Sequence, residues 1–117
     1  MKVLIVDDNE KVRGLVRDYL PASVGQVYEC GDGSEAFALY KKYLPDWVLM
    51  DWEMPEIDGL TATREIIAEF PTANICMVTA FDDEGLRGEA FAAGASGFVL
   101  KDNLFELETV LVSELKH

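Results

Sequence analysis

The feature that most constrains this chain is the alternation of short apolar runs with amphipathic segments, which occurs five times along its 117 residues. The apolar runs lie at 3–6, 26–30, 47–50, 74–79 and 97–101. Each is too short for a helix, and each is followed by a segment with helical spacing of its apolar residues. Strands that alternate with helices in this way form parallel sheets, so the sequence predicts an α/β fold.

The amphipathic segments carry signals that start and stop helices. Asp8 or Asn9 can cap the first, Asp32 the second, and Asn103 the last. Pro21, Pro45, Pro71 and Gly94 close the first four. The side chains expected to face the core are Val12, Leu15, Val16, Tyr19 and Leu20; Phe37, Tyr40 and Leu44; Leu60, Ile66, Ile67 and Phe70; and Leu104, Leu107, Leu111 and Leu115.

The segment from Asp82 to Ala93 is the weakest predicted helix. Gly85 and Gly88 lie inside it, and each costs about 1 kcal/mol relative to alanine in a helix. We therefore expect this helix to be the least firmly held of the five.

Length and charge limit the classes of function. A chain of 117 residues predicts one domain, 1–117, and its net charge of −12 argues against direct binding of nucleic acid or of an anionic membrane. No apolar run approaches the roughly 20 residues of a membrane span, and no cleavage pattern follows the N-terminal run, so we expect a cytoplasmic protein. Cys30 and Cys76 lie in predicted strands without metal-type spacing and are interpreted as buried thiols.

Polar side chains lie at the carboxyl ends of four of the predicted strands: Asp7 with Asp8, Asp51, Thr79 and Lys101. Right-handed crossovers bring these strand ends to one edge of the sheet. Taken singly, each has an ordinary structural explanation as a helix cap, a strand former or a solvated charge. Their joint placement instead predicts a site.

Three carboxylates in one small site repel one another unless a cation lies between them. Carboxylate and water oxygens suit Mg²⁺, which often works together with a phosphate. A lysine can neutralise a phosphate oxygen, and a threonine hydroxyl can donate to another. This combination is typical of phosphoryl transfer.

With these residues in place, the chain resembles a receiver domain of a two-component response regulator, the CheY-like superfamily. The resemblance implies a flavodoxin-like fold, a doubly wound five-stranded parallel sheet of strand order 2-1-3-4-5 with five helices. It spans essentially the whole chain. The matching motifs are Asp7-Asp8, Met50-Asp51-x-x-Met54-Pro55-x-x-Asp58-Gly59, Thr79-Ala80 and Gly94-Ala95-x-Gly97-Phe98-x-Leu100-Lys101.

The resemblance implies that Asp51 takes a phosphoryl group from the phosphohistidine of a sensor histidine kinase or a phosphotransfer domain. Asp7, Asp8, Asp51 and the backbone carbonyl of Glu53 would hold Mg²⁺, with Mn²⁺ as an alternative, and Lys101 would pair with the acyl phosphate. Such a chain is not an enzyme acting on a separate substrate. It is a phosphoacceptor that catalyses its own phosphorylation and dephosphorylation.

The resemblance also implies a conformational change on phosphorylation and a set of residues that tune the lifetime of the phosphoryl group. Thr79 would turn its hydroxyl onto the phosphoryl group, opening space into which Phe98 swings. Glu53 and Phe81 occupy the positions that tune the phosphate lifetime in the family. Two residues depart from the common pattern: Phe98 often appears as tyrosine, and Asp102 replaces a proline, so we expect a trans peptide after Lys101.

Further partners are implied by the second half of the chain. The Lys101-Asp102 pair and Gly94-Ala95-Ser96-Gly97 resemble receivers that precede a LuxR-type helix-turn-helix. Two alternatives stay open: a receiver separated from a DNA-binding output domain, or a stand-alone receiver. In either case the face formed by residues 82–116 is expected to meet an output domain or a second receiver, against the alternative that its charges are merely solvated.

Three other classes of protein share parts of this pattern. Phosphatases of the haloacid dehalogenase class also use an aspartyl nucleophile, but theirs lies in a D-x-D motif directly after the first strand. Here the corresponding pair, Asp51-x-Glu53, lies at the third strand. A flavodoxin needs a neutral phosphate-binding loop, and Asp7 and Asp8 would repel phosphate. A degenerate receiver that only docks proteins, independently of phosphorylation, remains the alternative.

Overall fold

The computed structural model describes residues 1–114, with side chains up to residue 112. The expected inward position of Leu115 and the last two residues of the 82–116 face lie outside this range. The elements, in chain order, are β1 (Lys2–Val6), α1 (Glu10–Asp18), β2 (Gln26–Cys30), α2 (Gly33–Tyr43), β3 (Trp47–Asp51), α3 (Gly59–Glu69), β4 (Ile75–Thr79), α4 (Glu84–Ala92), β5 (Gly97–Leu100), the 3₁₀ turn η1 (Lys101–Asn103) and α5 (Glu106–Glu114).

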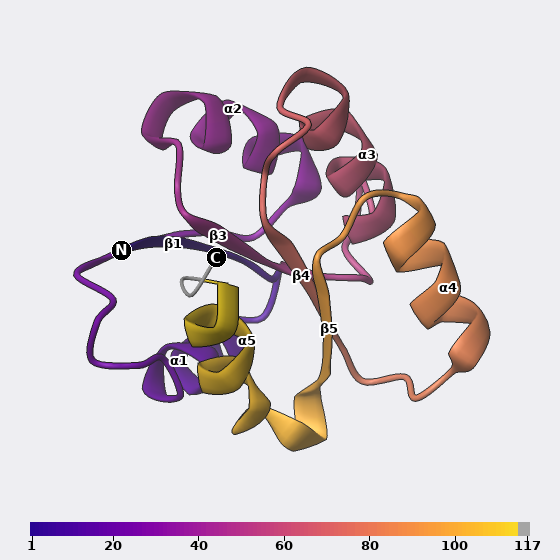
Figure 1. Ribbon diagram of the computed structural model, residues 1–117. Helices are drawn as coiled ribbons and strands as arrows, with labels where there is room; N and C mark the ends of the chain where they lie inside the picture. Colours follow the sequence, from indigo (N-terminus) through magenta and orange to yellow (C-terminus); the bar gives the residue numbers. More distant parts are fainter. Residues whose placement is uncertain (115–117) are drawn as a thin grey trace.

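The five strands form one parallel sheet in the order β2-β1-β3-β4-β5. This is the predicted flavodoxin-like order, and the α/β fold is confirmed. Figure 1 shows α1 and α5 on one face of the sheet and α2, α3 and α4 on the other. Both faces of β3 and β4 are therefore covered, which explains why these strands are apolar throughout until the polar residues that end them.

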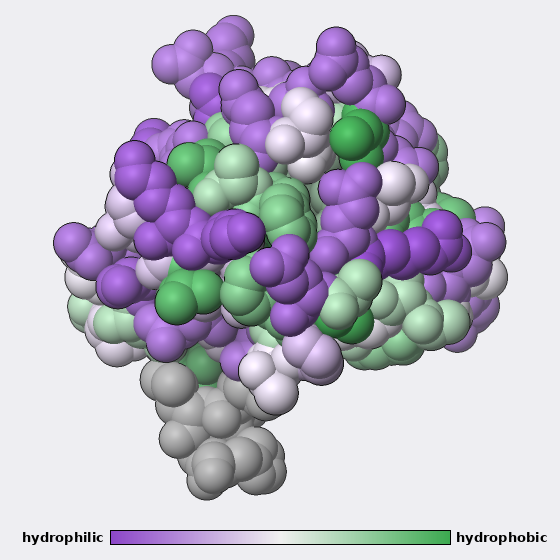
Figure 2. Space-filling model, turned by 90° about the horizontal axis from the view of Figure 1, so that it is seen from above, coloured by the Kyte–Doolittle hydropathy of each residue, from purple (hydrophilic) through white to green (hydrophobic). Residues whose placement is uncertain are grey.

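Alternate side chains of the strands divide the core into two layers. Leu4, Met50 and Met77 pack with α2, α3 and α4, whereas Ile5, Leu49 and Val78 pack with α1 and α5. Cys30 and Cys76 are buried and free, as predicted. The outer face over α2 and α3 is largely hydrophilic, with apolar groups between the charged ones, as Figure 2 shows. Within residues 1–114, no helix has the length and apolar character needed to cross a bilayer.

Three side chains that the helical spacing placed in the core are exposed instead. Leu15 and Tyr19 are 52% and 47% exposed, because the neighbouring row of α1, with Val12 and Val16, packs against the sheet, and Leu20 just beyond the helix joins the same layer. Leu44 is 58% exposed because it ends α2 in a left-handed conformation, with φ of 46°, where the chain leaves the path of the helix. These three predictions were wrong.

The start of the last helix was also predicted wrongly. Asn103 does not cap α5, because it is the last residue of the turn η1, and α5 begins at Glu106. The turn forms directly after β5, since Lys101 reaches back to the sheet edge while Leu104 must enter the core. The caps at Asn9, Asp32, Asp58 and Asp83 each accept a hydrogen bond from a backbone N–H of the first turn.

Candidate functional site

The predicted strand-end residues meet in one cavity of about 470 Å³. It lies at the carboxyl edge of the sheet, where doubly wound folds bind their ligands. The side chains come from the ends of β1, β3, β4 and β5, so the crossovers unite residues nearly a hundred positions apart. The cavity is lined by Asp7, Asp8, Asn9, Val12, Asp51, Glu53, Met54, Pro55, Thr79, Ala80, Phe81 and Lys101.

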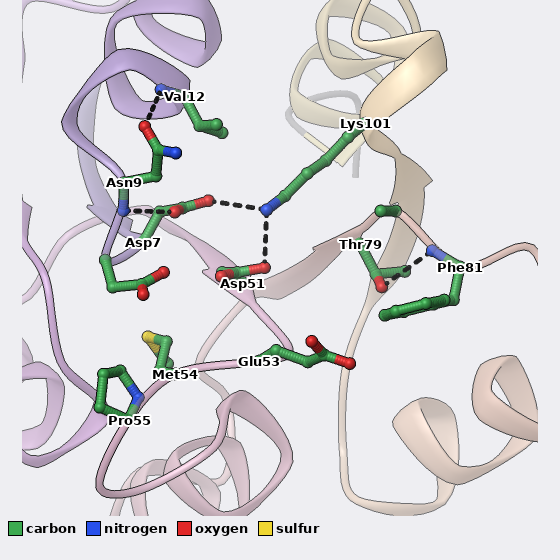
Figure 3. A pocket seen from close by; sticks show the side chains of 12 residues that line it. Asp7, Asn9, Val12, Asp51, Glu53, Met54, Pro55, Thr79, Phe81 and Lys101 are labelled. Carbon is green, nitrogen blue, oxygen red and sulfur yellow. Dashed lines mark hydrogen bonds and ion pairs between the residues drawn. The ribbon is translucent and has the colours of Figure 1, made fainter.

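Lys101 is the centre of the charged part of this site. Its Nζ lies 3.1 Å from Oδ2 of Asp7 and 2.9 Å from Oδ1 of Asp51 (Figure 3). Asp7 and Asp51 are only 3% and 5% exposed, so both ion pairs are screened little by solvent. The lysine therefore holds two buried carboxylates together.

Asp7, Asp8 and Asp51 form a cluster suited to a hard divalent cation. One carboxylate oxygen from each lies within 4.8 Å of the others. Asp8 is exposed and the other two are buried, so the cluster opens on one side to solvent. Oxygen ligands and an open side are what Mg²⁺ requires, since it keeps several waters. Lysine alone supplies one positive charge against three negative ones, and the donor set therefore fits the metal implied by the resemblance.

The same crowding changes the protonation of the site. Burial, together with the charges of Asp7 and Asp8, raises the pKa of Asp51 from 3.8 to about 6, although its hydrogen bond with Lys101 opposes the rise. Burial alone would lower the pKa of Lys101, but its hydrogen bonds with Asp51 and Asp7 outweigh that effect and raise the pKa. Near neutral pH the lysine is charged, and Asp51 is an anion held in an environment that disfavours charge.

The loop after Asp51 is held against the end of β3. The N–H of Gly59 donates to the carbonyl of Trp52 at 2.7 Å. A Cβ at position 59 would lie 2.0 Å from the backbone oxygen of Asp51, so the start of α3 can approach β3 only because residue 59 is glycine. Gly59 of the sequence motif thus allows the start of α3 to pack against the end of β3 that carries Asp51.

Thr79 and Phe81 lie across the cavity from the acidic turn, which consists of Asp7, Asp8 and Asn9 (Figure 3). Thr79 is buried, and its Oγ1 accepts a hydrogen bond from the N–H of Phe81 at 3.2 Å. The Phe81 ring is 47% exposed and flanks the cavity opening, as does Glu53. The hydroxyl of Thr79 keeps its own proton available for another acceptor.

Phe98 lies outside the cavity, on the side of β5 that faces α4. Its side chain is only 8% exposed, and the guanidinium of Arg87 lies 5.3 Å from its ring centroid. The same guanidinium lies 5.8 Å from the Phe91 ring. A second cavity, of about 420 Å³, opens on this face and is lined by Arg87, Phe98, Val99, Phe105, Glu106, Thr109 and Val110.

Sequence reasoning did not single out Arg13, which contacts the back of the site. Its Nη1 donates to the backbone carbonyl of Asp7 at 2.6 Å, and its Nε pairs with Glu29 at 3.0 Å. A lone arginine on a helix carries no local signal of such a contact, because its partners come from β1 and β2. The expected trans peptide after Lys101 is confirmed, since the described chain contains no cis peptide.

Comparisons with known proteins agree with this geometry. The family profile described as response regulator receiver domain matches residues 3–111. The chemotaxis protein CheY of Halobacterium salinarum is 41% identical over 100 residues, which are 86% of this chain and 83% of that protein. The chain spans about half the length of other curated relatives, the transcriptional regulatory proteins YxjL and YhcZ of Bacillus subtilis, of which it covers 50% and 49%.

Solved structures show the same fold. A two-component response regulator of the LuxR family from Aurantimonas is 32% identical, with a TM-score of 0.82 over 96% of this chain and 85% of that one. The receiver domain of the histidine kinase CKI1 from Arabidopsis thaliana, complexed with Mg²⁺, is 29% identical, with a TM-score of 0.82 over 97% and 90%. By sequence, fold and site, the chain belongs to the response regulator receiver domains.

Proposed function

We propose that this chain is a phosphoacceptor, which takes a phosphoryl group onto Asp51 in a Mg²⁺-dependent reaction with a sensor histidine kinase or a phosphotransfer domain. The observation that carries the proposal is the Lys101 bridge, in which one ammonium lies 3.1 Å and 2.9 Å from two buried carboxylates beside a third. Docking alone needs no such arrangement. Burial raises the pKa of the Asp51 carboxylate, which makes it more basic and therefore a stronger nucleophile toward phosphorus.

The transfer is a single displacement at phosphorus. An oxygen of the Asp51 carboxylate forms the new P–O bond as the P–N bond of the donor phosphohistidine breaks, and the leaving imidazole takes up a proton. Lys101, already 2.9 Å from Asp51, pairs with the developing charge on the phosphoryl oxygens. Asp7, Asp8, Asp51 and the backbone carbonyl of Glu53 would hold the cation. Bound Mg²⁺ would neutralise the charge that otherwise repels a phosphate from three carboxylates.

The response to phosphorylation begins at Thr79. Its hydroxyl, now an acceptor for the Phe81 N–H at 3.2 Å, turns toward the phosphoryl group and donates to it. Phe98 is already buried, with only 8% of its surface exposed, so it can gain little further burial. The change expected of its ring is therefore a small readjustment beneath the Arg87 guanidinium. Glu53 and Phe81, which flank the opening, set how easily water reaches the acyl phosphate.

The partner surface lies on the described part of the 82–116 face. Phe91 and Phe105 are 43% and 66% exposed there, beside the cavity that Arg87 and Phe98 line. We propose that an output domain or a second receiver binds this face. The net charge of −12 makes direct binding of nucleic acid by this domain unfavourable.

The test follows Trp52 fluorescence and intact mass while Mg²⁺ and then a small-molecule phosphodonor are added. Trp52 is half-buried beside the site, and Trp47, which is buried, supplies a constant background. The variant Asp51→Asn removes the acceptor, and Asp82→Asn is a matched control because Asp82 is exposed and lines neither cavity.

We expect a Mg²⁺-dependent phosphoryl adduct in the wild type and in Asp82→Asn, and none in Asp51→Asn. An adduct that persists in Asp51→Asn would place the acceptor elsewhere. No adduct in the wild type with either phosphodonor or kinase, despite Mg²⁺ binding, would favour the alternative of a phosphorylation-independent docking module.

A further inference from the structure

Arg13 connects the turn that carries Asp7 and Asp8 to the neighbouring strand β2. It lies in the second turn of α1, and its side chain runs back toward the start of the helix, as long side chains on helices do. Nη1 donates to the carbonyl of Asp7 at 2.6 Å, while Nε donates to Oε1 of Glu29 at 3.0 Å. One planar guanidinium therefore joins β1, α1 and β2.

The N–H, the carbonyl and the carboxylate of Asp7 each have a partner. Its N–H donates to the carbonyl of Cys30 at 3.1 Å, which extends the β1–β2 pairing by one step. Its carbonyl accepts from Arg13. Its carboxylate accepts from the N–H of Asn9 at 2.9 Å and pairs with Lys101 at 3.1 Å. Of these contacts, only the one to the carbonyl fixes the peptide that leads into Asp8.

Glu29 makes the arginine a fixed group rather than a mobile one. Its second carboxylate oxygen pairs with Arg17, one turn further along α1, so Glu29 bridges two arginines. The Arg13 side chain is 19% exposed, compared with 48% for Arg17. The two arginines thus share a partner and a helix face, but only Arg13 reaches the acidic turn.

We propose that Arg13 is a positioning residue for the divalent cation site, which acts by holding the Asp7–Asp8 peptide in the geometry that presents both carboxylates to the ion. The inference rests on the proposed function. Its physical basis is that cation affinity depends on ligands being held in place before binding, and outer partners of ligands commonly change affinity by 10-fold or more. The rigid fork of arginine can serve two acceptors at once, which an ammonium on a flexible stem does poorly.

The experiment measures the Mg²⁺ dissociation constant by calorimetry, and by Trp52 fluorescence, in the wild type, Arg13→Met and Arg17→Met. Arg17→Met is the matched control, since it removes the same kind of side chain from the same helix and the same Glu29, but no contact with Asp7. We expect Arg13→Met to weaken Mg²⁺ binding by about 10-fold, and Arg17→Met to leave it unchanged. Melting temperature, measured without metal, monitors the structural effect of each substitution separately.

Equal weakening by the two substitutions, or a lower melting temperature in Arg13→Met with unchanged Mg²⁺ affinity, would overturn the inference. Should Arg13→Met fail to fold, Arg13→Lys keeps the charge but not the rigid fork that reaches two acceptors, and we expect it to bind Mg²⁺ more weakly than Arg17→Met does. A wild type that binds no Mg²⁺ would overturn the proposed function and this inference together. Wild-type binding and adduct formation, with Arg13→Met binding equally well, would overturn the inference alone.

Discussion

The turn before α1 and the loop before α4 lie at the same edge of the sheet, but they are held differently. The turn at residues 7–9 is tied to three other elements by Lys101, by Arg13 and by the carbonyl of Cys30. The loop from Phe81 to Asp83 is exposed, and its hydrogen bonds within the described part of the chain join residues at most four positions apart. The turn at residues 7–9 is therefore held in one position by contacts with other elements. The loop at residues 81–83 has only local contacts, so it can change conformation more easily.

The helices that follow extend this difference. α4 buries only Ala90 fully and contains Gly85 and Gly88, and its contact with β5 includes the Arg87 guanidinium on the Phe98 ring. Contacts of this kind at exposed sites contribute about 0.5–1 kcal/mol each. Segments with few buried contacts open at low free energy, and regions that change conformation are drawn from them. The predicted weakness of α4 thus coincides with the face proposed for partners.

Among the substitutions considered, Lys101→Met should cause the largest loss of stability, because it removes the bridge between Asp7 and Asp51. Without metal, we expect the free energy of unfolding to fall by about 3 kcal/mol, because Asp7 and Asp51 are left buried without a counter-ion. The melting temperature of a chain of this size should then fall by about 10 °C. Thermal or urea unfolding in the presence of a chelator measures this.

The control for that measurement is Lys41→Met. Lys41 pairs with Glu69 at 3.7 Å on the surface, where the two side chains are 63% and 49% exposed. We expect this substitution to change the free energy of unfolding by less than about 0.5 kcal/mol. Equal losses for the two lysines would mean that the Lys101 bridge stabilises the fold no more than a surface pair does.

The free energy of unfolding of Asp51→Asn, measured as a function of pH, should show that the buried charge of Asp51 lowers the stability of the wild type. The pKa of Asp51 is raised by burial to about 6, so the folded state binds this proton more tightly than the unfolded state. The free energy of unfolding therefore falls as pH rises from 3.8 to about 6. Without metal, Asp51→Asn should be more stable than the wild type by about 3 kcal/mol above pH 7.

The gain should shrink as pH falls below 6 and vanish below about pH 4, where Asp51 is protonated in both states. Melting curves across this range, in chelator, provide the measurement. A stability difference that does not depend on pH would contradict the assignment, since it would come from packing rather than from charge.

The smallest effect is expected from a pair of glycines, Gly88 in α4 and Gly14 in α1. A Cβ at position 88 meets no atom within 4 Å, and one at position 14 meets only the Arg17 Nη2 at 3.7 Å. Both Gly88→Ala and Gly14→Ala should therefore stabilise their helices by about 1 kcal/mol. If α4 opens independently, its amide hydrogen exchange should slow by about fivefold in Gly88→Ala and stay unchanged in Gly14→Ala. A more stable Gly88→Ala protein with unaltered α4 exchange would show that α4 opens only with the whole domain.

Sequence patterns predicted the strands well because burial on both faces leaves a strong local signal. The end of β3 at Asp51 and the end of β4 at Thr79 were placed correctly. The inward faces of helices were predicted less well, since Leu15 and Tyr19 share the helical spacing of Val12 and Val16. Spacing alone defines a stripe of apolar residues, and the neighbouring sheet decides which row of that stripe is buried.

The sequence by itself determined the fold class, the strand ends and the residue types of the site, because each follows from the periodicity or punctuation of neighbouring residues. Only the tertiary structure decided that one lysine joins Asp7 and Asp51, that Arg13 supports the Asp7 carbonyl, and that Phe98 is already covered by Arg87. These contacts join residues from different strands and helices. Their distances depend on how the sheet and helices pack, and no local pattern along the chain carries that information.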